Sequence, residues 1–244
     1  MQQDWGWVAW VINGLVLLAA LLLTARNQVN ALLMRLMNSG KPELKQLPFY
    51  SAYYFHRKSQ LALLPKNNHI MFLGDSLTAE GEWAELLGIP VSNRGLSGDT
   101  TYGILQRLDV ILTCNPPKLF LMIGTNDIER RLELSVLLKN YQNILQQCCK
   151  ALPDTVIYVQ SILPVADRPD YPNKNQAIAI ANQHIATLAQ EFGYPFLNVH
   201  PHFVRADGSS RHQELDPQYS QDGVHLNGAG YQQWCNLIRE YVEA

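Results

Sequence analysis

From His69 to the end of the chain, short apolar runs alternate with longer segments in which apolar residues recur at helical spacing. The run 118–123 is almost continuously apolar, as expected for a strand of a parallel sheet that is covered on both faces. Strands are predicted over 69–73, 91–93, 118–123, 155–161 and 195–199, and helices over 51–64, 78–87, 101–113, 132–151, 174–192 and 228–243. This alternation predicts an α/β fold: a three-layer α/β/α sandwich around a five-stranded parallel sheet.

The pattern at the start of the chain is different. Residues 5–25 contain no charge and three tryptophans, which cluster at one end like an interfacial aromatic belt. As a helix this segment would be about 30 Å long, which matches the hydrocarbon core of a bilayer. A single retained transmembrane helix is predicted, with a cleaved signal peptide or a buried soluble helix as alternatives. The chain then divides into an anchor (1–25), a basic juxtamembrane connector (26–46) and the α/β domain (47–244).

Charge refines this picture. The formal net charge is −2, which argues against a general nucleic-acid binder. Residues 26–66 hold seven Lys or Arg and one acid, whereas 67–244 hold 12 Lys or Arg and 19 Asp or Glu. By the positive-inside rule, the basic residues after the span predict a single-pass membrane protein whose domain faces the cytoplasm. An extracytoplasmic domain is the alternative, because long domains are exported despite flanking charge.

Cysteine and histidine positions do not suggest a metal site, and no cofactor is predicted. The four cysteines lack zinc-type spacing and are interpreted as core thiols rather than disulfides or ligands. His200 and His202 end the fifth predicted strand, but no third ligand is suitably spaced.

Polar clusters follow three of the predicted strands, and another precedes the last helix. They are Gly74-Asp75-Ser76-Leu77, the segment 93–100, Gly124-Thr125-Asn126-Asp127 and the segment 222–227. The carboxyl ends of parallel strands meet at one edge of a sheet, so these clusters are expected to converge where α/β proteins bind their ligands. Asp75 and Asp99 are interpreted as turn or cap residues, and Asp127 as structural.

The clusters contain the groups that ester hydrolysis through a serine requires. Ser76 is the candidate nucleophile, His225 the base, and Asp222 the carboxylate that orients the imidazole. The N–H groups of Ser76 and Gly98, with the side-chain amide of Asn126, are the candidate oxyanion hole. Two apolar residues beside these groups, Leu77 and Leu96, are predicted to contact the acyl part of the substrate.

In this order and spacing, the four clusters resemble the conserved blocks of the SGNH (GDSL) hydrolases. Asn93-x-Gly95-x-x-Gly98-Asp99-Thr100-Thr101 and His225-Leu226-Asn227-x-x-Gly230-Tyr231 are most similar to lysophospholipase-L1-like and platelet-activating-factor-acetylhydrolase-like members. The resemblance covers 49–244 and implies a flavodoxin-like sheet. It also implies the Ser-His-Asp triad and the Ser/Gly/Asn oxyanion hole in the roles given above.

The expected activity is hydrolysis of a short-chain or acetyl O-ester by a metal-free serine esterase. One alternative is a lysophospholipase or acyl thioesterase for longer chains. Another is a membrane-tethered binding protein on the same fold. The expected partners are an acyl ester, small or lipid, and membrane lipid through the anchor. The sequence leaves open the alcohol part of the substrate and the oligomeric state.

Overall fold

The computed structural model describes residues 50–167, 172–205 and 213–244. All of them belong to one compact unit, Phe49–Ala244. Within these residues no helix is both long and apolar enough to cross a membrane. The predicted span at 5–25 and the connector at 26–46 lie outside the described residues.

The centre of the domain is a five-stranded sheet in the order β2-β1-β3-β4-β5. Its strands are β1 (Ile70–Gly74), β2 (Val91–Gly95), β3 (Lys118–Met122), β4 (Val156–Gln160) and β5 (Phe196–Leu197). Every pair is parallel, as predicted. Gly74 lies opposite both Gly95 and Met122, so the central strands end level with one another. This order is the flavodoxin-like one, in which ligands bind beyond the carboxyl ends of the strands.

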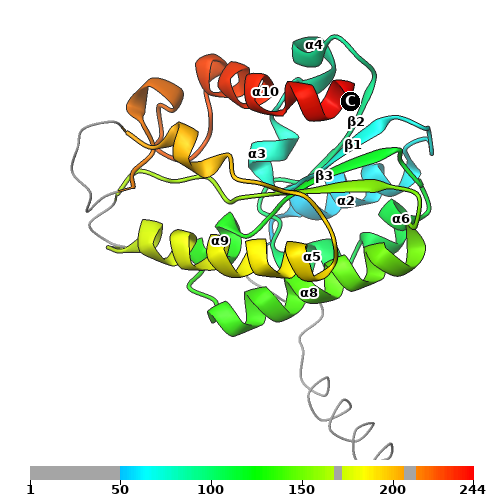
Figure 1. Ribbon diagram of the computed structural model, residues 1–244, viewed down its shortest axis with the longest axis horizontal. Helices are drawn as coiled ribbons and strands as arrows, with labels where there is room; N and C mark the ends of the chain where they lie inside the picture. The colour runs from blue at the N-terminus through cyan, green and yellow to red at the C-terminus, as the bar shows by residue number, and fades with distance from the viewer. Residues whose placement is uncertain (1–49, 168–171, 206–212) are drawn as a thin grey trace, which may run out of the picture. The chain divides into compact units, whose positions relative to one another are not determined.

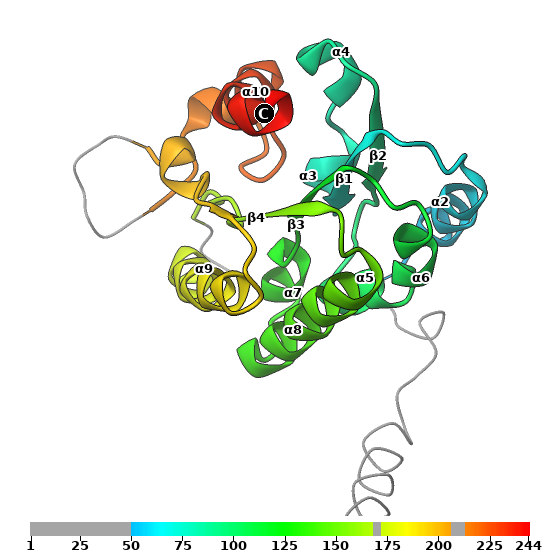
Figure 2. The same cartoon turned by 45° about the vertical axis from the view of Figure 1, so that its right-hand side comes forward.

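Helices cover both faces of the sheet (Figures 1 and 2). One face carries α3 (Ser76–Ala79), α4 (Trp83–Leu87) and α10 (Gly228–Glu243); the other carries α5 (Thr101–Leu105), α6 (Leu108–Leu112), α7 (Thr125–Glu129), α8 (Leu134–Ala151) and α9 (Lys174–Glu191). Strand side chains alternate between the two faces. Phe72 accordingly packs in the cluster of Trp83 and Trp234, while Met71 and Leu73 pack in the cluster of α8 and α9.

The helix predicted over 51–64 is confirmed as α2 (Ala52–Leu63). The Ser51 side chain caps its first turn by accepting from the N–H of Tyr54. The Tyr54 hydroxyl donates 2.9 Å to Asp99, which joins this helix to the loop after β2. Of the four cysteines, Cys148 and Cys235 are buried as predicted, Cys114 is partly buried and Cys149 is exposed.

Two predicted helices are wrong in their continuity. The segment 78–87 is divided into α3 and α4. The side-chain amide of Asn93 donates hydrogen bonds of 3.0–3.2 Å to the carbonyls of Thr78, Ala79 and Gly81, so these carbonyls do not continue the helix. The segment 101–113 is divided into α5 and α6 at Arg107, whose buried guanidinium is held by groups outside the helix. Three short elements were not predicted: α7, η2 (His200–Phe203) and η3 (Pro217–Tyr219).

Candidate active site

Ser76 stands at the junction of β1 and α3. Asp75 is the helix N-cap, and its side chain accepts 3.1 Å from the N–H of Leu77. A Cβ at Gly74 would lie 2.4 Å from the carbonyl oxygen of Met122, and a Cβ at Gly95 would lie 2.2 Å from the N of Ala79. Glycine at both positions therefore lets α3 lie directly on the strand ends, with Ser76 at the edge of the sheet.

The structure brings Ser76, His225 and Asp222 together, although the sequence separates the first two by 149 positions. Nε2 of His225 lies 3.0 Å from Oγ of Ser76, and Nδ1 of the same ring lies 2.7 Å from Oδ2 of Asp222. The other carboxylate oxygen of Asp222 accepts 2.8 Å hydrogen bonds from the backbone N–H groups of Val224 and His225. The loop backbone therefore fixes the carboxylate, and the carboxylate fixes the imidazole.

The loop that carries Asp222 and His225 is tied at several points. Gly223 adopts φ +81°, and its carbonyl accepts 2.7 Å from the N–H of Ala166 in the segment after β4. The Ser220 hydroxyl accepts 2.9 Å from the N–H of Gly223. Asn227 then caps α10 by accepting 3.0 Å from the N–H of Gly230. These bonds position the imidazole without a long element of regular structure.

Two carboxylates of the described residues, Asp222 and Glu80, lie within 4.0 Å of the His225 ring. Partial desolvation raises the pKa of Asp222, but the hydrogen bonds from the His225 ring and from two backbone N–H groups outweigh it, so the net shift is downward. Asp222 therefore stays ionised well into the acid range. Glu80, at the end of α3, places Oε1 4.0 Å from Nε2 of His225, and 49% of its side chain is exposed. Sequence reasoning missed Glu80, because no spacing rule relates it to the histidine.

The structure places each of the three predicted oxyanion-hole residues, Ser76, Gly98 and Asn126, in the segment that follows a strand. Ser76 is the first residue of α3, where helix geometry provides no acceptor for its N–H. Gly98 adopts φ +79°, and its carbonyl accepts 2.8 Å from Nη2 of Arg130. Asn126, on α7, donates one amide hydrogen to the carbonyl of Asp99 at 2.9 Å, which holds it against the loop of Gly98 and leaves the second hydrogen. Such donors can stabilise an oxyanion that forms at Ser76.

Three buried carboxylates support this edge without touching Ser76 Oγ. Asp99 accepts from the Tyr54 hydroxyl, the Thr100 N–H and Nε of Arg107. Asp127 accepts from both the N–H and the hydroxyl of Thr101. Burial raises the pKa of Asp75 to about 7 and that of Asp127 to about 6. Asp75 is confirmed as a helix cap, and Asp127 holds Thr101 as a structural group. Asp99 is not the cap of α5, which is Thr100; it is the partner of Arg107 in a buried ion pair.

The two apolar candidates lie in the interior. Leu77 is 1% exposed and Leu96 is 0% exposed, so neither presents side-chain surface at the edge. Their contribution to an acyl site stays a prediction. Among the described residues, no group of three or more His, Cys, Asp or Glu side chains is arranged to hold a metal ion.

Comparison with known proteins starts from the family models. The model of the GDSL-like lipase/acylhydrolase family matches residues 72–233, which include Ser76 at one end and His225 at the other. No curated protein matches the chain.

Solved structures with the same fold include three from different bacteria. A protein from Streptococcus pneumonia named for platelet activating factor has a TM-score of 0.70 and 29% identity, covering 78% of this chain and 92% of its own. A GDSL-like lipase from Bacteroides thetaiotaomicron has a TM-score of 0.66 and 24% identity, covering 78% of this chain and 97% of its own. The acetylxylan esterase Axe2 from Geobacillus stearothermophilus has a TM-score of 0.60 and 16% identity, covering 73% of this chain and 95% of its own.

Proposed function

This chain belongs to the GDSL-like lipase/acylhydrolase family, as its motifs predicted, and is an ester-hydrolysing enzyme; on that premise we propose that it removes short acyl groups from O-esters through Ser76. The observation that carries the proposal is the continuous chain of contacts from Ser76 Oγ through His225 to Asp222, at 3.0 and 2.7 Å. Family membership sets aside the non-enzyme alternative of a tethered binding protein.

In the proposed mechanism, Nε2 of His225 takes the proton as Ser76 Oγ attacks the ester carbonyl carbon. The carbonyl oxygen becomes an oxyanion that faces the N–H groups of Ser76 and Gly98 and the amide of Asn126. Collapse of this intermediate breaks the bond to the alcohol, which leaves with the proton from His225. Water, deprotonated by His225, then attacks the acyl-serine, and release of the acid restores the Ser76 hydroxyl.

We propose a short acyl group because of the burial of Leu77 and Leu96. A long chain needs apolar surface beside the nucleophile, but Leu77, directly after Ser76, and Leu96, two residues before Gly98, are both buried in the core. They would therefore limit the acyl site rather than extend it. Acetylxylan esterase and the protein named for platelet activating factor share this fold, and the first name is consistent with a short acyl group. The longer-chain alternative, a lysophospholipase or thioesterase, would require apolar surface from other residues.

The test is a series of p-nitrophenyl esters from acetate to palmitate, assayed with the wild type, Ser76→Ala and the matched control Ser59→Ala. Ser59 is an exposed serine on α2 and does not belong to the proposed site. We expect kcat/KM to be highest for acetate or butyrate, to vanish in Ser76→Ala and to be unchanged in Ser59→Ala. A maximum at long chains would select the alternative, and turnover by folded Ser76→Ala would exclude the mechanism.

We further propose that residues 5–25 anchor the enzyme in a membrane, with the domain on the cytoplasmic side. The support is the uncharged run of bilayer length and the basic residues that follow it. Two C-terminal fusions test this, one to a reporter active only in the cytoplasm and one to a reporter active only outside. Signal from the outside reporter alone would select the extracytoplasmic alternative. Release from membranes by carbonate would exclude the span.

A further inference from the structure

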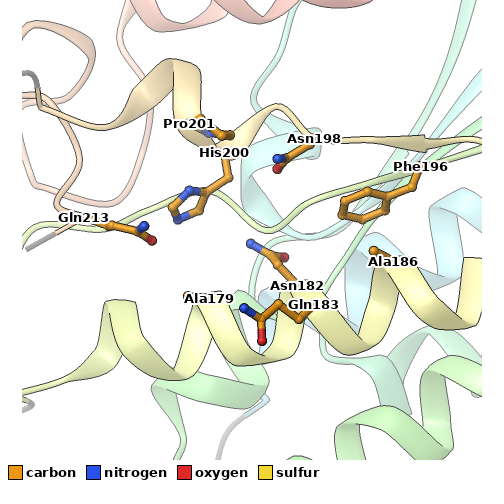
Figure 3. Close-up of a pocket in the computed structure, with 9 residues that line it drawn as sticks. All are labelled: Ala179, Asn182, Gln183, Ala186, Phe196, Asn198, His200, Pro201 and Gln213. Atoms are coloured by element: carbon orange, nitrogen blue, oxygen red, sulfur yellow. The ribbon is translucent and has the colours of Figure 1, made fainter. Parts of the chain in front are cut away.

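A second site lies between α9, β5 and η2. It is a pocket of about 260 Å³. Its lining residues are Ala179, Asn182, Gln183, Ala186, Phe196, Asn198, His200, Pro201 and Gln213, which do not include the proposed catalytic groups. Figure 3 shows His200 and Phe196 on one side of the space and Asn182 and Ala186 of α9 on the other.

His200 is the most unusual group in this pocket. His200 is 5% exposed. Its backbone N–H donates a 2.8 Å hydrogen bond to the hydroxyl of Ser161, which fixes the position of His200 after β5. Its Nε2 is buried and has no hydrogen-bond partner among the described residues. Burial also lowers the pKa of His200 to about 4, so the ring is neutral near pH 7. A buried polar atom without a hydrogen-bond partner costs folding free energy. The unpaired Nε2 of His200 therefore points to a ligand that would supply the missing hydrogen bond.

The remaining lining is uncharged and mixed in character. Four carboxamides are present, each able to donate and accept: Asn182, Gln183, Asn198 and Gln213. Asn182 is held rigidly, because it donates 2.9 Å to the carbonyl and accepts 2.7 Å from the N–H of Ile162. Small or apolar surface comes from Phe196, Pro201 and two alanines. None of the nine lining side chains is ionised near neutral pH.

These features together define the ligand. A carboxylate or phosphate would need a cationic partner, and an amine would need an anionic one; the described lining supplies neither. A fatty acyl chain would leave the carboxamides without partners. Vicinal hydroxyls match carboxamides and a neutral imidazole, because each of these groups donates and accepts. The C–H face of a sugar ring matches Phe196 and Pro201.

We propose that this pocket binds a unit of a neutral saccharide, with Asn198 and Gln183 bonding its hydroxyls and the His200 ring at its floor. The site is separate from Ser76 and does not depend on the esterase activity proposed above. It would give the enzyme a means of holding a glycan by a part that it does not cleave.

The test is binding of the full-length protein to an array of neutral and acidic glycans, followed by calorimetric titration of the strongest neutral glycan. We expect binding to at least one neutral glycan, and a loss of about fivefold or more in affinity for each of Asn198→Ala and Gln183→Ala. Gln190→Ala, at an exposed position of α9 outside the pocket, is the matched control and should bind like the wild type.

Three results would overturn the proposal. They are the absence of binding to every neutral glycan, a preference for acidic glycans, and unchanged affinity in the double variant Asn198→Ala/Gln183→Ala. A pocket that holds only ordered water would appear as the first of these. The measurement uses no ester and no turnover, so its failure would leave the proposed esterase function intact.

Discussion

Arg107 and Asp99 form a buried ion pair, with Nε 2.8 Å from Oδ2 and side chains 4% and 0% exposed. The same guanidinium donates 3.2 Å from Nη2 to the carbonyl of Gly74. Gly74 lies two residues before Ser76, and Asp99 directly follows Gly98. The pair therefore joins the loop of the proposed nucleophile to the loop of a proposed oxyanion donor. Both loops depend on Arg107, whose charge neutralises the buried Asp99 carboxylate.

Arg107→Ala should destabilise the fold, because it leaves the Asp99 carboxylate buried without its cation. We expect a loss of about 3–5 kcal/mol in the free energy of unfolding, measured by urea denaturation. The matched control is Arg57→Ala, since Arg57 contacts Gln60 on the exposed surface of α2 and should contribute less than about 0.5 kcal/mol. A loss below about 1 kcal/mol for Arg107→Ala would show that the pair does not hold these loops.

Asp222→Asn tests the orientation of the imidazole. The amide keeps the size of the carboxylate but cannot stabilise the imidazolium that forms when His225 takes the serine proton. We expect kcat to fall by roughly 10³–10⁴-fold, with little change in KM or in thermal unfolding. Asp216→Asn, at the N-cap of η3 in the same part of the chain, is the control. Equal effects of the two changes would mean that Asp222 acts on loop stability alone.

Much of this site was predictable because the carboxyl ends of parallel strands must meet at one edge. Ser76, Gly98 and Asn126 each follow a strand, so the strand assignments were enough to predict that they lie at one edge. His225 follows Asp222 on one turn, but its approach to Ser76 also depends on the loop before α10, which the strand assignments do not position. The breaks in the helices were not predictable in that way. The break after α3 depends on Asn93 donating to the carbonyls of Thr78 and Ala79, and the break at Arg107 depends on its bond to Asp99. No local sequence pattern encodes either contact.

The same limit explains the groups that sequence reasoning missed. Glu80 approaches His225 through the placement of α3 against the last loop, and its sequence separation gives no sign of this. His200 was considered only as a metal ligand, because its burial and its missing partner emerge only when β5, η2 and α9 are packed together.

Asp127 should make the stability of the enzyme depend on pH. Burial raises its pKa from 3.8 to about 6, so the folded state binds more protons than the unfolded state between these values. Its contribution is therefore most favourable in acid, and stability falls as pH rises from about 4 through about 6. Asp127→Asn removes this ionisation and can still bond both groups of Thr101. Relative to the variant, the wild type should lose up to about 3 kcal/mol between pH 4 and pH 7.

Urea denaturation of both proteins at each pH checks this difference. Because the other titratable groups are shared, the comparison isolates Asp127 from carboxylates whose pKa is lowered, such as Asp222. A constant difference across this range would contradict the assignment of a raised pKa to Asp127.

Glu80→Gln should change the preference for substrate charge. Its carboxylate lies 4.0 Å from Nε2 of His225 and disfavours anionic groups on the substrate at that side. Because the side chain is half exposed, we expect only about a two- to fivefold rise in kcat/KM for an anionic ester relative to its neutral analogue. Glu82→Gln, an exposed acid two positions further on, is the control. An equal rise in both variants would assign the effect to overall charge.

Asn126→Ala tests the oxyanion hole most directly. The amide has two hydrogens: one is held by the Asp99 carbonyl, and the other is free to meet an oxyanion at Ser76. Loss of the hydrogen bond from this second hydrogen to the oxyanion should reduce kcat by roughly 10²–10³-fold, while ground-state binding and hence KM change little.

Loss of the first hydrogen bond is structural, so a matched variant is needed to separate the two effects. Asn140→Ala removes a comparable bond, 3.1 Å to the hydroxyl of Thr101, on α8 away from the nucleophile. Both variants should lose about 1 kcal/mol of stability, because each loses one partly buried hydrogen bond. Only Asn126→Ala should lose kcat. If Asn140→Ala were equally slow, the loss would come from movement of the shared loop, and Asn126 would not donate to the oxyanion.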